Sequence, residues 1–111
     1  MKDCFVMGFS QGGIMAFELG RSLTKSLAGM GIISSRIIKR DKKPNIIFQQ
    51  TPIFISHGEQ DDVLPVSNFN QSLDTLKNDN YSFVSHLIKE DTHTMSPVTI
   101  KLFQDFIKKN I

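Results

Sequence analysis

A serine lies between two glycines near the start of the chain. The segment Gly8-Phe9-Ser10-Gln11-Gly12 matches the pattern G-x-S-x-G, in which a sharp strand-to-helix turn projects a serine hydroxyl as a nucleophile. Side chains at Gly8 or Gly12 are expected to collide with the neighbouring strand and helix. The backbone N–H of Gln11, at the start of the helix, is expected to stabilise a developing oxyanion. The pattern therefore predicts acyl-transfer chemistry at Ser10.

Three histidines are candidates for the base that such a serine needs. His86 falls within an expected strand, where a packed or surface imidazole is the favoured interpretation. His57 ends an earlier strand and is expected to shape the turn that follows it. His93 lies in a loop before the last helix, where a base can reach the serine. We therefore assign His93 as the general base.

The third member of such a site is a carboxylate that orients the histidine. Asp61 and Asp62 both follow the third expected strand, and their spacing does not decide between them. Asp91 is nearest to His93 in the sequence, but a separation of two residues is poor for a side-on hydrogen bond. The orienting carboxylate is therefore Asp61 or Asp62 on these grounds.

Strands and helices are expected to alternate along the chain and to position these residues. Apolar or alternating runs predict strands at residues 3–7, 27–33, 52–56 and 81–88. Helices are expected after residue 13, over residues 66–77 and from Ser96-Pro97, where serine is the N-cap and proline the first helical residue. Because parallel strands need helical crossovers, this order predicts an α/β fold around a parallel sheet.

Two other segments have expected structural roles. Residues 34–50 are polar and basic, which predicts an exposed connection. A binding role for this loop, with Lys42 and Lys43 attracting an anionic head group, is a weaker alternative to a solvated loop. Cys4 is expected to be a small buried residue of the first strand rather than a second nucleophile.

Composition limits the class of protein. The 111 residues fit one domain, residues 1–111, and 40% hydrophobic with 22% charged residues is typical of a globular chain. A net charge of +2 does not imply a nucleic-acid or membrane partner. No apolar run approaches the roughly 18 residues of a spanning helix, so membrane insertion is not expected. A single cysteine excludes an internal disulfide and a cysteine-built metal site, which favours a cytoplasmic location.

Three motifs resemble those of a known family. They are the segment G-F-S-Q-G-G at residues 8–13, the segment H-G-E-Q-D-D-V-L-P at residues 57–65, and His93 followed by Ser96-Pro97 and a final helix. A serine, an aspartate and a histidine in this order are typical of α/β-hydrolases. The motifs together resemble the phospholipase/carboxylesterase family, which includes the acyl-protein thioesterases.

This resemblance implies a fold, an acid and a reaction. It implies a three-layer α/β-hydrolase-type parallel sheet, of which the chain resembles the C-terminal half without the N-terminal strands. It favours Asp61, the fifth position of H-G-x-x-D-x-x-x-P, over Asp62 as the acid. The implied reaction is hydrolysis of a small carboxylic ester or acyl thioester through an acyl-enzyme on Ser10, with no metal or organic cofactor.

Two alternatives to an active hydrolase remain open. In the first, the chain is a catalytically inert fragment. In the second, it is a half-enzyme that is active only when an N-terminal polypeptide completes it. A second copy of the chain or this missing half is the partner that these alternatives would require.

Overall fold

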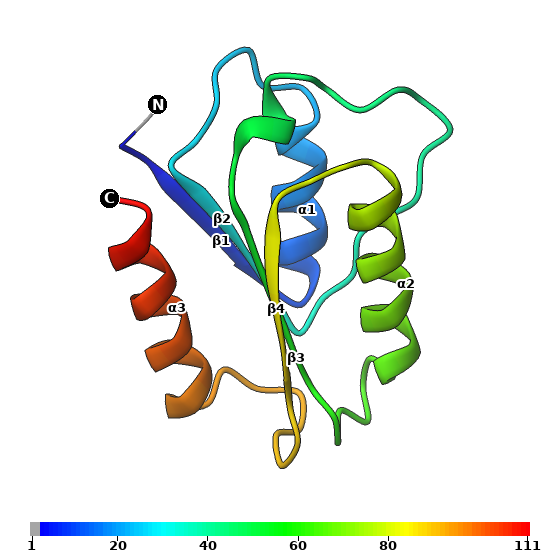
Figure 1. Cartoon of the computed structure of the whole chain (residues 1–111). Coiled ribbons are helices and arrows are strands. Elements are labelled where there is room, and N and C mark those ends of the chain that lie inside the picture. Colours follow the sequence, from blue (N-terminus) through cyan, green and yellow to red (C-terminus); the bar gives the residue numbers. More distant parts are fainter. Residues whose placement is uncertain (1–2) are drawn as a thin grey trace.

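The computed structural model describes residues 3–111 as one parallel β-sheet with helices on both faces (Figure 1). The sheet has the strand order β1-β2-β3-β4, and each strand is parallel to its neighbours. The strands are β1 (Phe5–Phe9), β2 (Gly29–Ile33), β3 (Ile53–Gly58) and β4 (Phe83–Ile88). The predicted α/β fold is confirmed, with β1 beginning two residues later and β3 ending two residues later than expected.

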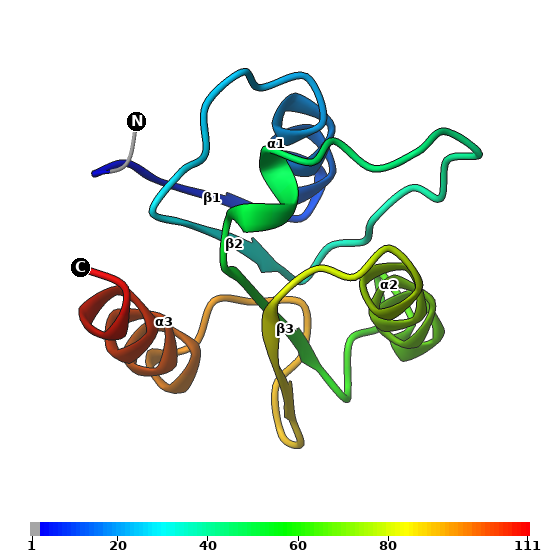
Figure 2. The same cartoon turned by 45° about the horizontal axis from the view of Figure 1, so that its top comes forward.

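Helices form the outer layers of the structure. They are α1 (Gln11–Gly20), α2 (Val66–Asn78) and α3 (Pro97–Lys109). Helices α1 and α2 cover one face of the sheet, and α3 covers the other (Figures 1 and 2). The predicted start of the last helix is confirmed, because Ser96 is the N-cap, its Oγ accepts from the Thr99 N–H, and Pro97 is the first helical residue.

Aromatic rings fill the core between the sheet and helices α1 and α2. Phe17, Phe48 and Tyr81 pack edge to face, with ring centroids 5.0 to 5.5 Å apart. Gly20 makes room for this cluster, since a Cβ there would lie 2.2 Å from Phe48 Cζ. The short 3₁₀ helix η1 (Phe48–Gln50) therefore belongs to the core.

The expectation of an exposed connection over residues 34–50 is only partly right. Residues 39–43 are exposed, as predicted. Ile37 and Phe48 are buried in the core, and Ser34 and Ser35 are buried where the chain leaves β2. The basic residues of this segment indicated exposure, although Ile37 and Phe48 attach it to the core. The expectation for Cys4 is wrong, because it precedes β1 and is exposed.

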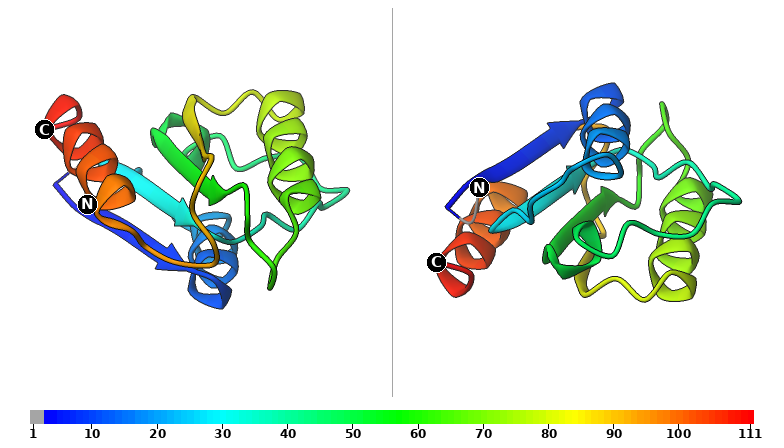
Figure 3. Two further views of the ribbon diagram at one scale, coloured as in Figure 1. Left: turned by 90° about the horizontal axis from the view of Figure 1, so that it is seen from below. Right: turned by 90° about the horizontal axis from the view of Figure 1, so that it is seen from above.

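The opposite core lies between the sheet and α3. Ile33 and Phe54 of the sheet pack against Phe103 and Phe106 of the helix. The ring of Phe5 meets Phe106 edge-on at 6.3 Å, so the start of β1 and the end of α3 lie side by side (Figure 3). Within residues 3–111, no helix is long and apolar enough to cross a membrane.

Helix α1 approaches the sheet through two close glycine contacts. A Cβ at Gly8 would lie 2.2 Å from the carbonyl oxygen of Gly12, which confirms the expected collision at Gly8. A Cβ at Gly13 would lie 2.5 Å from Ser35 Cβ. The collision expected at Gly12 is wrong, because Gly12 is exposed and, apart from its chain neighbours and the backbone of its own helix, no atom of the described residues lies within 4 Å of its Cβ position.

The outer face of α1 is also less buried than its composition suggested. Ala16 and Phe17 pack into the core, whereas Met15 is 71% and Leu19 57% exposed. Among the described residues, β1 is an edge strand, with β2 as its neighbour. The described residues therefore leave both an apolar face of α1 and the edge of β1 uncovered.

The two adjacent glycines give a matched test of this packing. We expect Gly13→Ala to lower the free energy of unfolding by about 1 to 3 kcal/mol, because its methyl group must displace Ser35. Gly12→Ala is the control, and it should stay within about 1 kcal/mol of the wild-type value, because alanine favours helix and meets nothing there. Urea denaturation measures both, and equal effects would contradict the described contact.

Candidate active site

Ser10 lies in a strained turn between β1 and α1. Its φ of 55° is in the left-handed region that a serine rarely adopts. Three contacts hold this conformation: the Ser10 N–H donates to the Ile33 carbonyl at 2.9 Å, and the Ser10 carbonyl accepts from the Gly13 N–H at 3.0 Å and from Ser35 Oγ at 2.5 Å. The turn is thus held from both its donor and its acceptor side.

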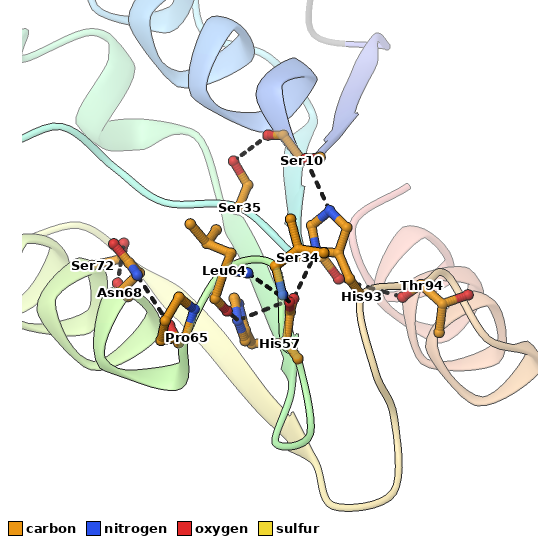
Figure 4. A network of polar contacts seen from close by, with 12 residues as sticks. Ser10, Ser34, Ser35, His57, Leu64, Pro65, Asn68, Ser72, His93 and Thr94 are labelled. Carbon is orange, nitrogen blue, oxygen red and sulfur yellow. Dashed lines mark hydrogen bonds and ion pairs between the residues drawn. The ribbon is translucent and has the colours of Figure 1, made fainter.

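The structure brings the predicted serine, histidine and Asp61 together. Ser10 Oγ lies 3.0 Å from His93 Nε2, and His93 Nδ1 lies 2.7 Å from Asp61 Oδ2. Figure 4 shows the ring of His93 between the serine turn and the loop after β3. The three residues follow the carboxyl ends of β1, β3 and β4, which meet at one edge of a parallel sheet.

Asp61 is held as a buried carboxylate. Its Oδ1 accepts from the N–H groups of Val63 at 2.9 Å and Leu64 at 2.7 Å. Burial alone would raise the pKa of Asp61, but these hydrogen bonds and the His93 ring outweigh it and lower the pKa below its ordinary value. The ionised group therefore stabilises the fold at neutral pH, and this contribution is lost as the pH falls through the lowered pKa. Asp62, the open alternative, is exposed.

The loop that carries His93 is fixed at both ends. The carboxylate of Asp91 accepts from Ser96 Oγ at 2.5 Å and from Thr99 Oγ1 at 3.4 Å, so Asp91 is bound to the N-cap and first turn of α3 and does not orient the histidine. The backbone of this loop packs on β3, where a Cβ at Gly58 would lie 2.4 Å from the carbonyl oxygens of Asp91 and Thr92. The end of β3 therefore supports the loop of His93 as well as the turn of Asp61.

Two serines that the sequence reasoning missed connect the turn of Ser10 with the loop of His93. Ser34 has a φ of 50°, and its Oγ donates to the Thr94 carbonyl at 3.3 Å. The next residue, Ser35, donates to the Ser10 carbonyl (Figure 4). The available signal was a pair of small polar residues directly after a buried strand.

The remaining candidates take different places. His86 of β4 packs against Phe54 of β3, with ring centroids 5.4 Å apart, as expected for a packed imidazole. Gln11 begins α1, so its N–H belongs to the first turn, where helical N–H groups lack partners inside the helix. His57 is fully buried and contacts the Leu64 carbonyl at 2.8 Å, beside the turn that it was expected to shape. Over residues 3–111, no group of three or more His, Cys, Asp or Glu is placed to hold a metal ion.

Known proteins with similar sequences are acyl-protein thioesterases. The chain is 31% identical to acyl-protein thioesterase 1 of Saccharomyces cerevisiae, with 99% of this chain and 51% of that protein covered. It is 30% identical to the protein of the same name from Emericella nidulans, with 94% of this chain and 46% of that protein covered. The chain thus spans about half the length of these relatives.

Solved structures and a family model agree with this similarity. SOBER1 of Arabidopsis thaliana superposes with a TM-score of 0.89 at 23% identity, covering 96% of this chain and 52% of that one, so the two share a fold. The family model for phospholipases and carboxylesterases matches residues 1–111. Because this match extends over the whole sequence, the chain belongs to the phospholipase/carboxylesterase family of α/β-hydrolases.

Proposed function

We propose that this chain is a serine hydrolase that cleaves carboxylic esters or acyl thioesters through an acyl-enzyme on Ser10. The observation that carries the proposal is the continuous line of hydrogen bonds from Ser10 Oγ through His93 to Asp61. The names of the similar acyl-protein thioesterases support the same class of substrate.

Acylation begins with the proton of Ser10. His93 Nε2 takes this proton while Oγ forms a bond to the acyl carbon, and the carbonyl electron pair moves onto oxygen. In this proposal the Gln11 N–H, in the first turn of α1, donates to this oxyanion. The carbonyl then re-forms, the C–O or C–S bond breaks, and the leaving group takes the proton from His93.

Deacylation repeats these steps with water. His93 removes a proton from a water molecule, whose oxygen attacks the acyl carbon and displaces Ser10 Oγ. The products are a carboxylic acid and the free serine, which recovers its proton from His93. Asp61 stays ionised throughout, because its lowered pKa keeps it charged, and it stabilises the positive imidazolium of each step.

A second candidate is a half-enzyme that needs a further polypeptide. Met15 and Leu19 of α1 are exposed, β1 is an edge strand among the described residues, and Gly12 has free space at its Cβ position. Relatives are about twice as long as this chain, since it covers 46% and 51% of two of them. A further polypeptide would pair with the edge of β1, cover the exposed face of α1 and supply a second oxyanion donor, which is worth about 100- to 1,000-fold in rate.

The nucleophile is tested by replacing it. We expect Ser10→Ala to reduce hydrolysis of a p-nitrophenyl ester by the purified chain to the uncatalysed background, because no other hydroxyl is hydrogen-bonded to His93 Nε2 among the described residues. Ser67→Ala, at an exposed serine of α2, is the control and should keep the wild-type rate. Activity that survives in Ser10→Ala would defeat the assignment.

The acid is tested by a pair of adjacent aspartates. Asp61→Asn should lower kcat on the order of 1,000- to 10,000-fold, because the amide can neither stabilise the imidazolium nor hold the neutral His93 ring in the tautomer with its proton on Nδ1. Asp62→Asn makes the same replacement of a carboxylate by an amide at an exposed position and should leave kcat unchanged. Steady-state kinetics decide, and a larger loss in Asp62→Asn would mean that the wrong carboxylate was chosen.

The second candidate makes its own prediction about the apolar surface. If it holds, the purified chain self-associates through this surface, and Met15→Glu combined with Leu19→Lys yields a monomer whose turnover stays slow. Light scattering with the ester assay measures both properties. A wild-type monomer that hydrolyses esters as fast as the intact Saccharomyces cerevisiae relative would rule out the half-enzyme.

A further inference from the structure

His57 is a buried titratable group that the proposed reaction does not use. It lies in β3, directly before Gly58, and its side chain is wholly shielded from solvent. Its ring packs against Phe69 of α2, with ring centroids 5.7 Å apart. A histidine costs more to bury than an apolar side chain of similar size, so its polar atoms should have a role there.

The Nε2 atom of His57 faces two oxygens. It lies 2.8 Å from the Leu64 carbonyl oxygen and 3.4 Å from Asp61 Oδ2 (Figure 4). A carbonyl and an ionised carboxylate only accept hydrogen bonds, so Nε2 must carry the proton and donate it. Nδ1 is buried and has no hydrogen-bond partner among the described residues, so Nε2 is the ring atom through which His57 contacts its polar surroundings.

The carboxylate oxygen that His57 approaches is the one that orients the base. Asp61 Oδ2 accepts from His93 Nδ1 at 2.7 Å and lies 3.4 Å from His57 Nε2, while Oδ1 is occupied by two backbone N–H groups. The Asp61 carboxylate therefore has contacts at both oxygens, and these contacts restrict its rotation and its movement away from His93. The Leu64 carbonyl, held by the same His57 proton, belongs to the turn that supplies one of those N–H groups.

We propose that His57 is a positioning residue that fixes the Asp61 carboxylate for its hydrogen bond to His93. This inference rests on the proposed function, because its consequence is a faster acyl transfer at Ser10. His57 acts through its Nε2 proton and touches neither the serine nor the substrate. The loss of that proton, with the ring shape retained, should therefore lower kcat and leave KM unchanged.

Three variants separate the proton from the packing. His57→Phe keeps an aromatic ring against Phe69 and removes the donor. His57→Gln keeps an N–H group near the position of Nε2 and removes the ring. His86→Phe makes the same chemical change at the half-buried histidine of β4 and is the matched control.

Kinetics and stability are measured on all three variants. His57→Phe should lower kcat on the order of 10- to 100-fold at constant KM, because it leaves the buried Leu64 carbonyl without its donor and removes the N–H group beside Asp61 Oδ2. His57→Gln should recover most of this loss even where its thermal stability is lower, and His86→Phe should match the wild-type protein. An unchanged kcat in His57→Phe, or losses of kcat that follow stability in all variants, would overturn the proposal.

Proton NMR tests the proposal without turnover. The wild-type chain should show a downfield proton from the His93 Nδ1–H to Asp61 bond, and a nitrogen spectrum of His57 with its proton on Nε2. In His57→Phe the downfield signal should shift or broaden, and in His86→Phe it should not. A His57 protonated on Nδ1 overturns the proposal even if no variant folds, whereas unchanged hydrolysis by Ser10→Ala overturns only the proposed function.

Discussion

The hydrogen bond between Ser10 Oγ and His93 Nε2, 3.0 Å long, joins residues that are 83 positions apart. A separation of this size cannot be closed by local structure and requires the whole sheet. Parallel strands meet this requirement, since β1, β3 and β4 all end at the edge where the three polar side chains lie. The aromatic cores on the two faces of the sheet then hold these ends in register.

Small residues and strained turns make the short contacts of this edge possible. Ser10 and Ser34 both adopt positive φ values, a cost of about 1 to 3 kcal/mol each that the surrounding packing must offset. Gly13 and Gly58 let neighbouring backbone and side-chain atoms approach where a Cβ would collide. The same edge therefore combines local strain with close packing, a combination typical of sites that perform chemistry.

The strands, the helices and the grouping of Ser10, Asp61 and His93 were predictable from the sequence, but the residues that support this group were not. Periodicity and caps placed four strands and three helices, because their apolar patterns are local. The choice between Asp61 and Asp62 stayed open on spacing alone, since the direction of a side chain in a turn depends on contacts from other elements. For the same reason the sequence predicted a collision at Gly12, whereas the structure has it at Gly13. The burial of Phe48 was not predicted, because the polar and basic composition of residues 34–50 indicated an exposed connection.

A covalent adduct would test most directly whether His93 activates Ser10. The chain is treated with an alkyl fluorophosphonate, which loses fluoride to an activated serine Oγ, and its peptides are analysed by mass spectrometry. The account predicts one phosphonyl group on the peptide that contains Ser10, and no adduct in His93→Ala. An unmodified Ser10, or equal labelling in His93→Ala, would contradict it.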